Sequence, residues 1–148
     1  SLANWPQWRG PTFNGVAPMG DPPTRWTTTE NLRWKVPIAG RGHSTPILWG
    51  ERIFLVTAIP IDKQLPPPYV IPADTPRIGE HNSVIKTWKP QALVLMCLDR
   101  ASGRRRWQQI VSEVMPHQGY HWKGSFASAS PITNHQNKYT NNHTYTLK

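Results

Sequence analysis

Histidine is the residue type in this sequence whose chemistry is most readily recruited for binding or proton transfer. His43 lies in the segment Gly-Arg-Gly-His-Ser-Thr-Pro, just before a predicted strand, where an imidazole could ligate a metal or move a proton. A lone histidine between Gly and Ser more often only forms hydrogen bonds within its loop. His43 is therefore the one weak candidate for a cofactor-binding residue. His117 and His121 have i, i+4 spacing, but Gly119 between them disfavours the helix that such a metal site needs.

The carboxylates and serines do not form a recognisable catalytic pattern. Asp62 and Asp74 lie in a proline-rich stretch, and Asp99 is assigned to a turn, so no acidic pair is placed for acid–base chemistry. Ser128 and Ser130 alternate with alanines and lack the flanking glycines of a nucleophile elbow. The sequence predicts no catalytic residue and no metal site.

The amino-acid composition excludes several classes of protein and of site. The 148 residues suffice for one core, while 16 Pro and 10 Gly disfavour long helices. The single cysteine, Cys97, excludes an internal disulfide and a cysteine-rich zinc site. No apolar run is long enough for a membrane span, and no basic-then-apolar leader opens the chain, so any signal peptide is expected to have been removed.

The net charge of +9 could indicate nucleic-acid binding, but the basic residues are scattered. Only Arg100 and Arg104 to Arg106 form a cluster, which we interpret as a solvated edge that discourages strand aggregation. A nucleic-acid partner is not predicted.

The chain divides into three segments by composition. Residues 1–31 are rich in turn formers and contain Trp5, Trp8 and Trp26, which predicts an irregular segment pinned by aromatic anchors. The segment 134–148 is polar and is expected to be a tail without regular structure.

The central segment predicts an all-β fold of short strands and tight turns. Strand-like alternation or apolar runs occur at 32–38, 46–49, 52–57, 92–99, 104–111 and 125–133. Gly50-Glu51 predicts a hairpin turn. Residues 59–91 contain seven prolines and predict a long insertion.

Two parts of this segment echo each other. Trp34 corresponds to Trp107, and Pro46-Ile47 corresponds to Pro131-Ile132, each in the order tryptophan-bearing strand, loop, small polar residues, proline and apolar strand. A repeat of this kind is typical of radially arranged sheets.

The stretch Cys-Leu-Asp-Arg-Ala-Ser-Gly-Arg-Arg-Arg-Trp resembles the tryptophan-docking motif of pyrroloquinoline-quinone-type (PQQ-like) β-propeller repeats, Ala-x-Asp-x-x-Thr-Gly-Lys-x-x-Trp. The matched positions are Cys97 for Ala, Asp99, Ser102 for Thr, Gly103, Arg104 for Lys, and Trp107. The stretch Asn4 to Pro11 and its continuation also resemble the start of exported bacterial PQQ-like proteins. The likeness covers about residues 4–58 and 92–133.

The chemistry of this motif can be stated from its residues. Asp99 and Ser102 can bond turn amides, and Gly103 can supply a positive φ before the next strand returns. Trp107 would then lie on the outer strand, packed against a neighbouring sheet with its N–H on a carbonyl. Cys97 is expected to be a buried small apolar group, with a reactive thiol as the alternative.

The resemblance implies a partial β-propeller: a closing N-terminal strand at 32–38, one nearly complete blade at 44–114, and the first strand of the next at 126–133. It implies an exported protein, periplasmic or extracellular, in which this chain is an incomplete piece that meets a protein partner or the remaining blades through open strand edges. The implied function is a non-catalytic binding or scaffolding module. The alternative is a fragment of a PQQ-dependent dehydrogenase that binds PQQ with calcium, although a single cysteine excludes the vicinal pair typical of those enzymes.

Overall fold

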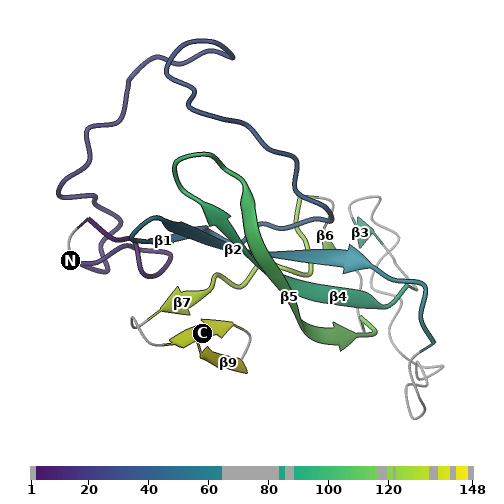
Figure 1. Ribbon diagram of the computed structural model, residues 1–148. Helices are drawn as coiled ribbons and strands as arrows, with labels where there is room; N and C mark the ends of the chain where they lie inside the picture. Colours follow the sequence, from purple (N-terminus) through teal and green to yellow (C-terminus); the bar gives the residue numbers. More distant parts are fainter. Residues whose placement is uncertain are drawn as a thin grey trace.

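The regular elements of the protein are all β-strands (Figure 1). The computed structural model describes residues 3–64, 84–85, 89–116, 120–121, 123–133, 137–140 and 143–146. No helix occurs within these ranges, so the predicted all-β class is confirmed.

A four-stranded antiparallel sheet forms the centre of the molecule. Its strands are β1 (Ile47–Trp49), β2 (Arg52–Pro60), β4 (Gln91–Asp99) and β5 (Arg105–Val114), in the order β1-β2-β4-β5. This agrees with the four strands expected between residues 44 and 114. Successive strands are neighbours, so each returns beside the one before it, and β1 and β5 form the two edges (Figure 1).

Strand β4 buries apolar side chains on both faces of the sheet. Leu93, Leu95 and Cys97 face a core that also contains Phe54. The intervening apolar side chains, Ala92, Val94 and Met96, face a second, smaller cluster on the opposite side. Because side chains alternate along a strand, a continuous apolar run buries itself on both faces.

The turn between β1 and β2 is the tight hairpin that the sequence predicts. Trp49 pairs with Arg52, which leaves Gly50 and Glu51 as the two loop residues. Gly50 has a φ of 57° and Glu51 is not among the positive-φ residues, as in a type II′ turn with glycine in its first central position.

Two smaller sheets accompany the central one. β3 (Val84–Ile85) pairs with β6 (Tyr120–His121), and β7 (Ile132–Thr133), β8 (Asn137–Thr140) and β9 (His143–Thr146) pair in the order β7-β8-β9. The structure therefore differs from the expectation that residues 134–148 form a tail without regular structure.

The expected strand at residues 32–38 is not formed. Leu32 and Ile38 are exposed, and no described strand pairs with this segment. Alternation of side chains specifies which face a strand would bury, but a strand also needs a neighbour for its backbone groups. Only Trp34 and Val36 are partly buried here, and Trp34 fixes the segment through its side chain.

The expected strand at 126–133 is shorter than predicted, because only the two residues of β7 pair as a strand. Two long strands also extend into the expected insertion, 59–91. β2 ends at Pro60, and β4 begins at Gln91. Most of that insertion, residues 65–83 and 86–88, lies outside the described residues.

The two halves of the internal echo lie side by side. The Ala127 carbonyl accepts the N–H groups of both His43 and Ser44, each at 3.0 Å. The hydroxyl of Ser130 accepts the N–H of Thr45 at 2.8 Å. The segment leading into β1 is therefore bonded directly to the segment leading into β7.

The N-terminal strap, residues 3–10, joins both of these segments. Trp5 exchanges two backbone hydrogen bonds with Leu48 in β1, and the Pro6 carbonyl accepts the N–H of Thr133 in β7. The Trp5 ring also packs against Gly10. Trp5 is thus one of the predicted aromatic anchors.

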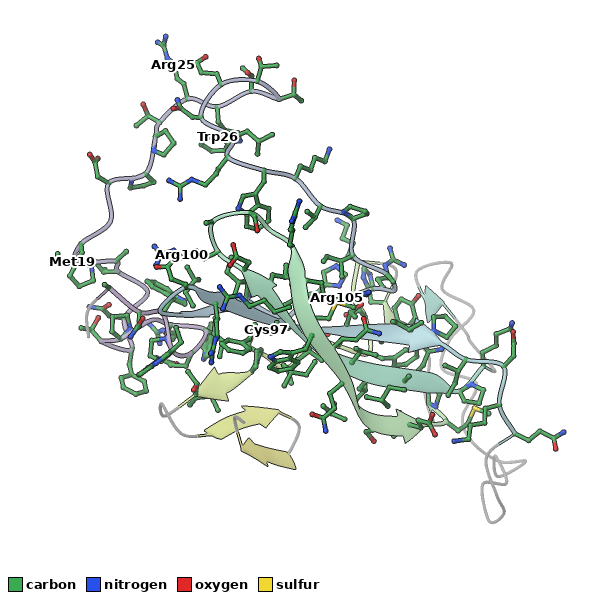
Figure 2. All side chains as sticks on the ribbon, in the orientation of Figure 1. Met19, Arg25, Trp26, Cys97, Arg100 and Arg105 are labelled. Carbon is green, nitrogen blue, oxygen red and sulfur yellow. The ribbon has the colours of Figure 1, made fainter. Side chains whose placement is uncertain are left out.

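The other predicted anchors in residues 1–31 are not buried. Trp8 is 61% exposed, and its ring lies beside the Arg9 guanidinium. Trp26 is 70% exposed and sits on a long arch that leaves the sheet before the chain returns to it (Figures 1 and 2). The prediction of aromatic anchoring is therefore wrong for these two tryptophans.

Candidate functional site

The turn between β4 and β5 is organised by the Asp99 carboxylate. Its Oδ1 accepts hydrogen bonds from the N–H of Ala101 at 3.1 Å and from the N–H and hydroxyl of Ser102 at 2.9 and 2.8 Å. Gly103 donates its N–H to the Asp99 carbonyl at 2.8 Å and has a φ of 71°. The predicted hydrogen bonds of Asp99 and the predicted positive φ of Gly103 are confirmed.

Arg106 adds an ion pair that the sequence motif does not indicate. Its Nε and Nη2 both donate to Asp99 Oδ2. The Arg106 hydrogen bonds, followed by those from Ser102, hold the pKa of the Asp99 carboxyl far below its usual range. Asp99 is therefore ionised at neutral pH and serves the turn rather than proton transfer.

The outer surface of this turn receives the side chain of Trp34. The indole Nε1 donates to the Arg100 carbonyl at 3.0 Å. The ring lies so close to Gly103 that a Cβ atom there would be 2.6 Å from Trp34 Cε3. Gly103 is thus required both for its positive φ and for the space that the indole occupies.

Trp107, on the edge strand β5, occupies the corresponding place in the second half of the echo. It is half-buried, pairs across the strands with Cys97, and its ring centroid lies 5.9 Å from that of Phe54. Its indole N–H donates to no described residue. The expected carbonyl partner in a neighbouring sheet is therefore not present among the described residues.

Cys97 is completely buried in the main core cluster, in the middle of the sheet (Figure 2). This confirms that it is a buried apolar group. A thiol reactive towards solvent would have to be reached through the packed sheet.

A separate cleft of about 260 Å³ opens near the far ends of β2 and β4. Five parts of the chain contribute to its walls: the loop before β1, the end of β2, the start of β4, β6, and the segment before β7. The lining residues are Gly40, Arg41, Ala58, Pro60, Gln91, Tyr120, Ser125 and Phe126.

Tyr120 contacts both Arg41 and Phe126 in this cleft. The Arg41 guanidinium lies 5.7 Å from the Tyr120 ring centroid, and its Nη1 is 3.4 Å from the Tyr120 hydroxyl. Tyr120 also meets Phe126 edge to face, with ring centroids 4.7 Å apart. The side chains at the mouth of the cleft are therefore held in place by one another.

Ser125 is a polar residue in the lining of the same cleft. The residue is only 8% exposed, and its hydroxyl is buried without a hydrogen-bond partner among the described residues. A buried hydroxyl without a partner is costly, because it has given up its hydrogen bonds to water.

The histidine candidates fall outside this cleft lining. His43 is exposed and contributes its backbone N–H to Ala127, whereas Arg41, two residues before it, lines the cleft. His121 is exposed in β6, where its Nδ1 accepts the Lys123 N–H, and His117 lies outside the described residues. No group of three or more His, Cys, Asp or Glu that could hold a metal occurs in the described part of the chain.

The basic cluster binds mostly within its own sheet. Arg106 pairs with Asp99, Arg105 donates to the Gln108 side chain, and Arg100 donates to the Gly50 carbonyl. Three of the four arginines in this cluster therefore have a partner in the central sheet or its turns.

Comparison with known proteins adds no relative from which a role could be transferred. The chain matches no protein-family profile, no curated protein and no solved structure. Across the ranges that the structure describes, no helix has the length and apolar character needed to cross a bilayer.

Proposed function

We propose that this chain is a non-catalytic binding or scaffolding module of an exported PQQ-like β-propeller protein, and that its central sheet acts as one blade. The observation that carries the proposal is the clamp between Trp34 and the Asp99–Gly103 turn. It joins a segment that precedes the sheet to the turn at the sheet's outer edge.

The same kind of clamp can extend in the other direction. The sheet receives one tryptophan, Trp34, and presents a second, Trp107, from its edge strand β5. The two occupy equivalent places in the sequence echo. A sheet that accepts one indole and offers another is suited to assembly in series, as in a propeller.

An open edge of the sheet supplies the second requirement of a scaffold. β5 has only one neighbouring strand in the central sheet, whereas the outer edge of β1 is already bonded to Trp5 through Leu48. An unpaired strand edge readily accepts another strand, from further blades or from a protein partner. Export to the periplasm or the extracellular space is part of the proposal and rests on the resemblance of the motif.

Sedimentation velocity over a wide range of protein concentration tests the scaffolding role. We expect the chain to self-associate, and Trp107→Phe to weaken this association, because phenylalanine keeps an aromatic ring but lacks the indole N–H. The matched control is Trp26→Ala, which removes an exposed tryptophan on the arch. A strictly monomeric chain, or equal association of the wild type and Trp107→Phe, would contradict the proposal.

A titration with PQQ and Ca²⁺ tests the non-catalytic assignment separately. We expect no saturable change in tryptophan fluorescence or heat. Saturable binding at one equivalent would instead favour the dehydrogenase fragment.

A further inference from the structure

The cleft beside Tyr120 combines one cation, one buried hydroxyl and mostly apolar walls. We propose that it binds a small monocarboxylate that carries a single aromatic ring. This site does not depend on whether the sheet belongs to a propeller, because all of its walls come from this chain.

The size of the cleft selects a small ligand. Its volume of about 260 Å³ lies just below the range of typical drug-sized pockets. A cavity of roughly 150 Å³ holds one benzene molecule. The cleft therefore has room for one aromatic ring and a carboxylate attached to it.

Arg41 provides the positive charge for the carboxylate. It forms no ion pair with any described residue, and its guanidinium is oriented by the Tyr120 ring rather than by an acid. A planar guanidinium can donate two parallel hydrogen bonds to a carboxylate, which an ammonium group cannot do with the same geometry.

The backbone at Arg41 is fixed before any ligand arrives. Arg41 exchanges two backbone hydrogen bonds with Ala58 in β2, each at 2.9 Å. The preceding residue, Gly40, has a φ of 81°, and a Cβ there would lie 2.4 Å from the Ala58 carbonyl oxygen. This close approach of the loop to β2 is available only to glycine, so it places Arg41 at the rim of the cleft.

Ser125 provides the second polar group. Ser125 lines the cleft, and its buried hydroxyl has no protein partner among the described residues. A ligand oxygen would give this hydroxyl the hydrogen bond that it lacks. The desolvation cost of the hydroxyl is already incurred in the free protein, so binding gains the hydrogen bond without incurring that cost again.

The apolar walls provide the surface for the ring. Phe126 packs against the main core, and Tyr120 meets its ring edge to face. Ala58 and Pro60 line the cleft from the end of β2. Because aromatic rings favour edge-to-face and offset contacts, this surface accepts a further ring.

Benzoate is the probe, and its binding to the full chain is measured by chemical-shift perturbation of ¹⁵N-labelled protein. We expect saturable binding with a dissociation constant on the order of 1 mM, because the ligand is small and forms few polar contacts. Acetate lacks the ring and benzamide lacks the charge, so both should bind at least about tenfold more weakly. Equal binding of benzoate and benzamide would overturn the proposal.

Two variants assign the polar contacts. Arg41→Gln should weaken benzoate binding about fivefold to tenfold, while Arg25→Gln on the distant arch leaves it unchanged (Figure 2). Ser125→Ala should weaken binding about threefold to tenfold without lowering the thermal midpoint, since it removes a hydroxyl that lacks a protein partner. Unchanged benzoate affinity in Arg41→Gln, or a lowered midpoint with unchanged affinity in Ser125→Ala, would overturn these assignments.

The result of the benzoate-binding test does not depend on the result of the self-association test. Loss of benzoate binding leaves the association through Trp107 untouched, and a monomeric chain leaves the cleft intact. The two proposals can therefore fail separately.

Discussion

Trp34 covers Gly103 so closely that any side chain at residue 103 would enter the indole ring. The two residues come from segments far apart in the sequence, and the contact is completed by the hydrogen bond from the indole to the Arg100 carbonyl. The conformation of this turn is set by neighbouring residues, and the turn also binds an aromatic side chain from a distant part of the sequence.

Gly103→Ala should destabilise the protein more than Gly50→Ala. Both glycines have a positive φ, 71° and 57°, so both substitutions carry a backbone cost of roughly 1 kcal/mol. Only at Gly103 does the new Cβ meet another group, since a Cβ at Gly50 would have nothing within 4 Å of it. Chemical denaturation should show an additional loss of about 1 to 3 kcal/mol for Gly103→Ala. Equal losses would mean that Trp34 does not occupy this space in solution.

Trp34→Ala should lower the free energy of unfolding by about 2 kcal/mol, since the ring is half-buried and its N–H is bonded. Trp34→Phe keeps most of the packing and should lose roughly 1 kcal/mol through the hydrogen bond. The control is Trp26→Ala, an exposed tryptophan for which a change within about 0.5 kcal/mol is expected. A Trp34→Ala variant as stable as the control would rule out the clamp.

Trp107→Ala should be more damaging than His43→Ala. Trp107 packs against Phe54 and the main core, so its truncation should cost about 3 kcal/mol. The His43 side chain is exposed, and its backbone N–H bond to Ala127 survives the substitution. Comparison of the two unfolding midpoints in denaturant checks the ranking. Equal shifts would show that Trp107 is not a packing residue.

The pH dependence of stability should contain a contribution from Asp99. Its pKa is lowered in the folded protein by Arg106 and Ser102, relative to about 3.9 in an unfolded chain. The unfolded state therefore takes up the proton first, so this stabilisation is complete above about pH 4 and is lost as the pH falls below that value. Asp99→Asn should be less stable than the wild type at neutral pH, and the difference should shrink in acid. A difference that is constant between pH 7 and pH 2 would contradict this reasoning.

Features determined by neighbouring residues can be predicted from the sequence. The turn from Asp99 to Gly103 and the hairpin at Gly50-Glu51 depend on residue types within a few positions, and both form as expected. The alternating run at 32–38 is misleading because alternation carries no information about whether a partner strand is present. For the same reason Trp8 and Trp26 can be recognised as aromatic but not as exposed.

The cleft cannot be predicted, because its residues come from segments with no shared pattern. Arg41 is less conspicuous in the sequence than His43, and Ser125 only becomes notable once its hydroxyl is seen to lack a partner. The hairpin of β8 and β9 does have a local signal. Two runs containing Tyr and Thr flank Asn141-Asn142, a turn-forming pair that the polar composition obscures.

The N-terminal strap places the earliest residues of the described chain between two much later ones. Trp5 bonds to Leu48, and the Pro6 carbonyl bonds to Thr133. During synthesis the Pro6 carbonyl must therefore do without this partner until Thr133 leaves the ribosome, on the order of ten seconds later. The contact between Pro6 and Thr133 can therefore close only after the central sheet has been synthesised.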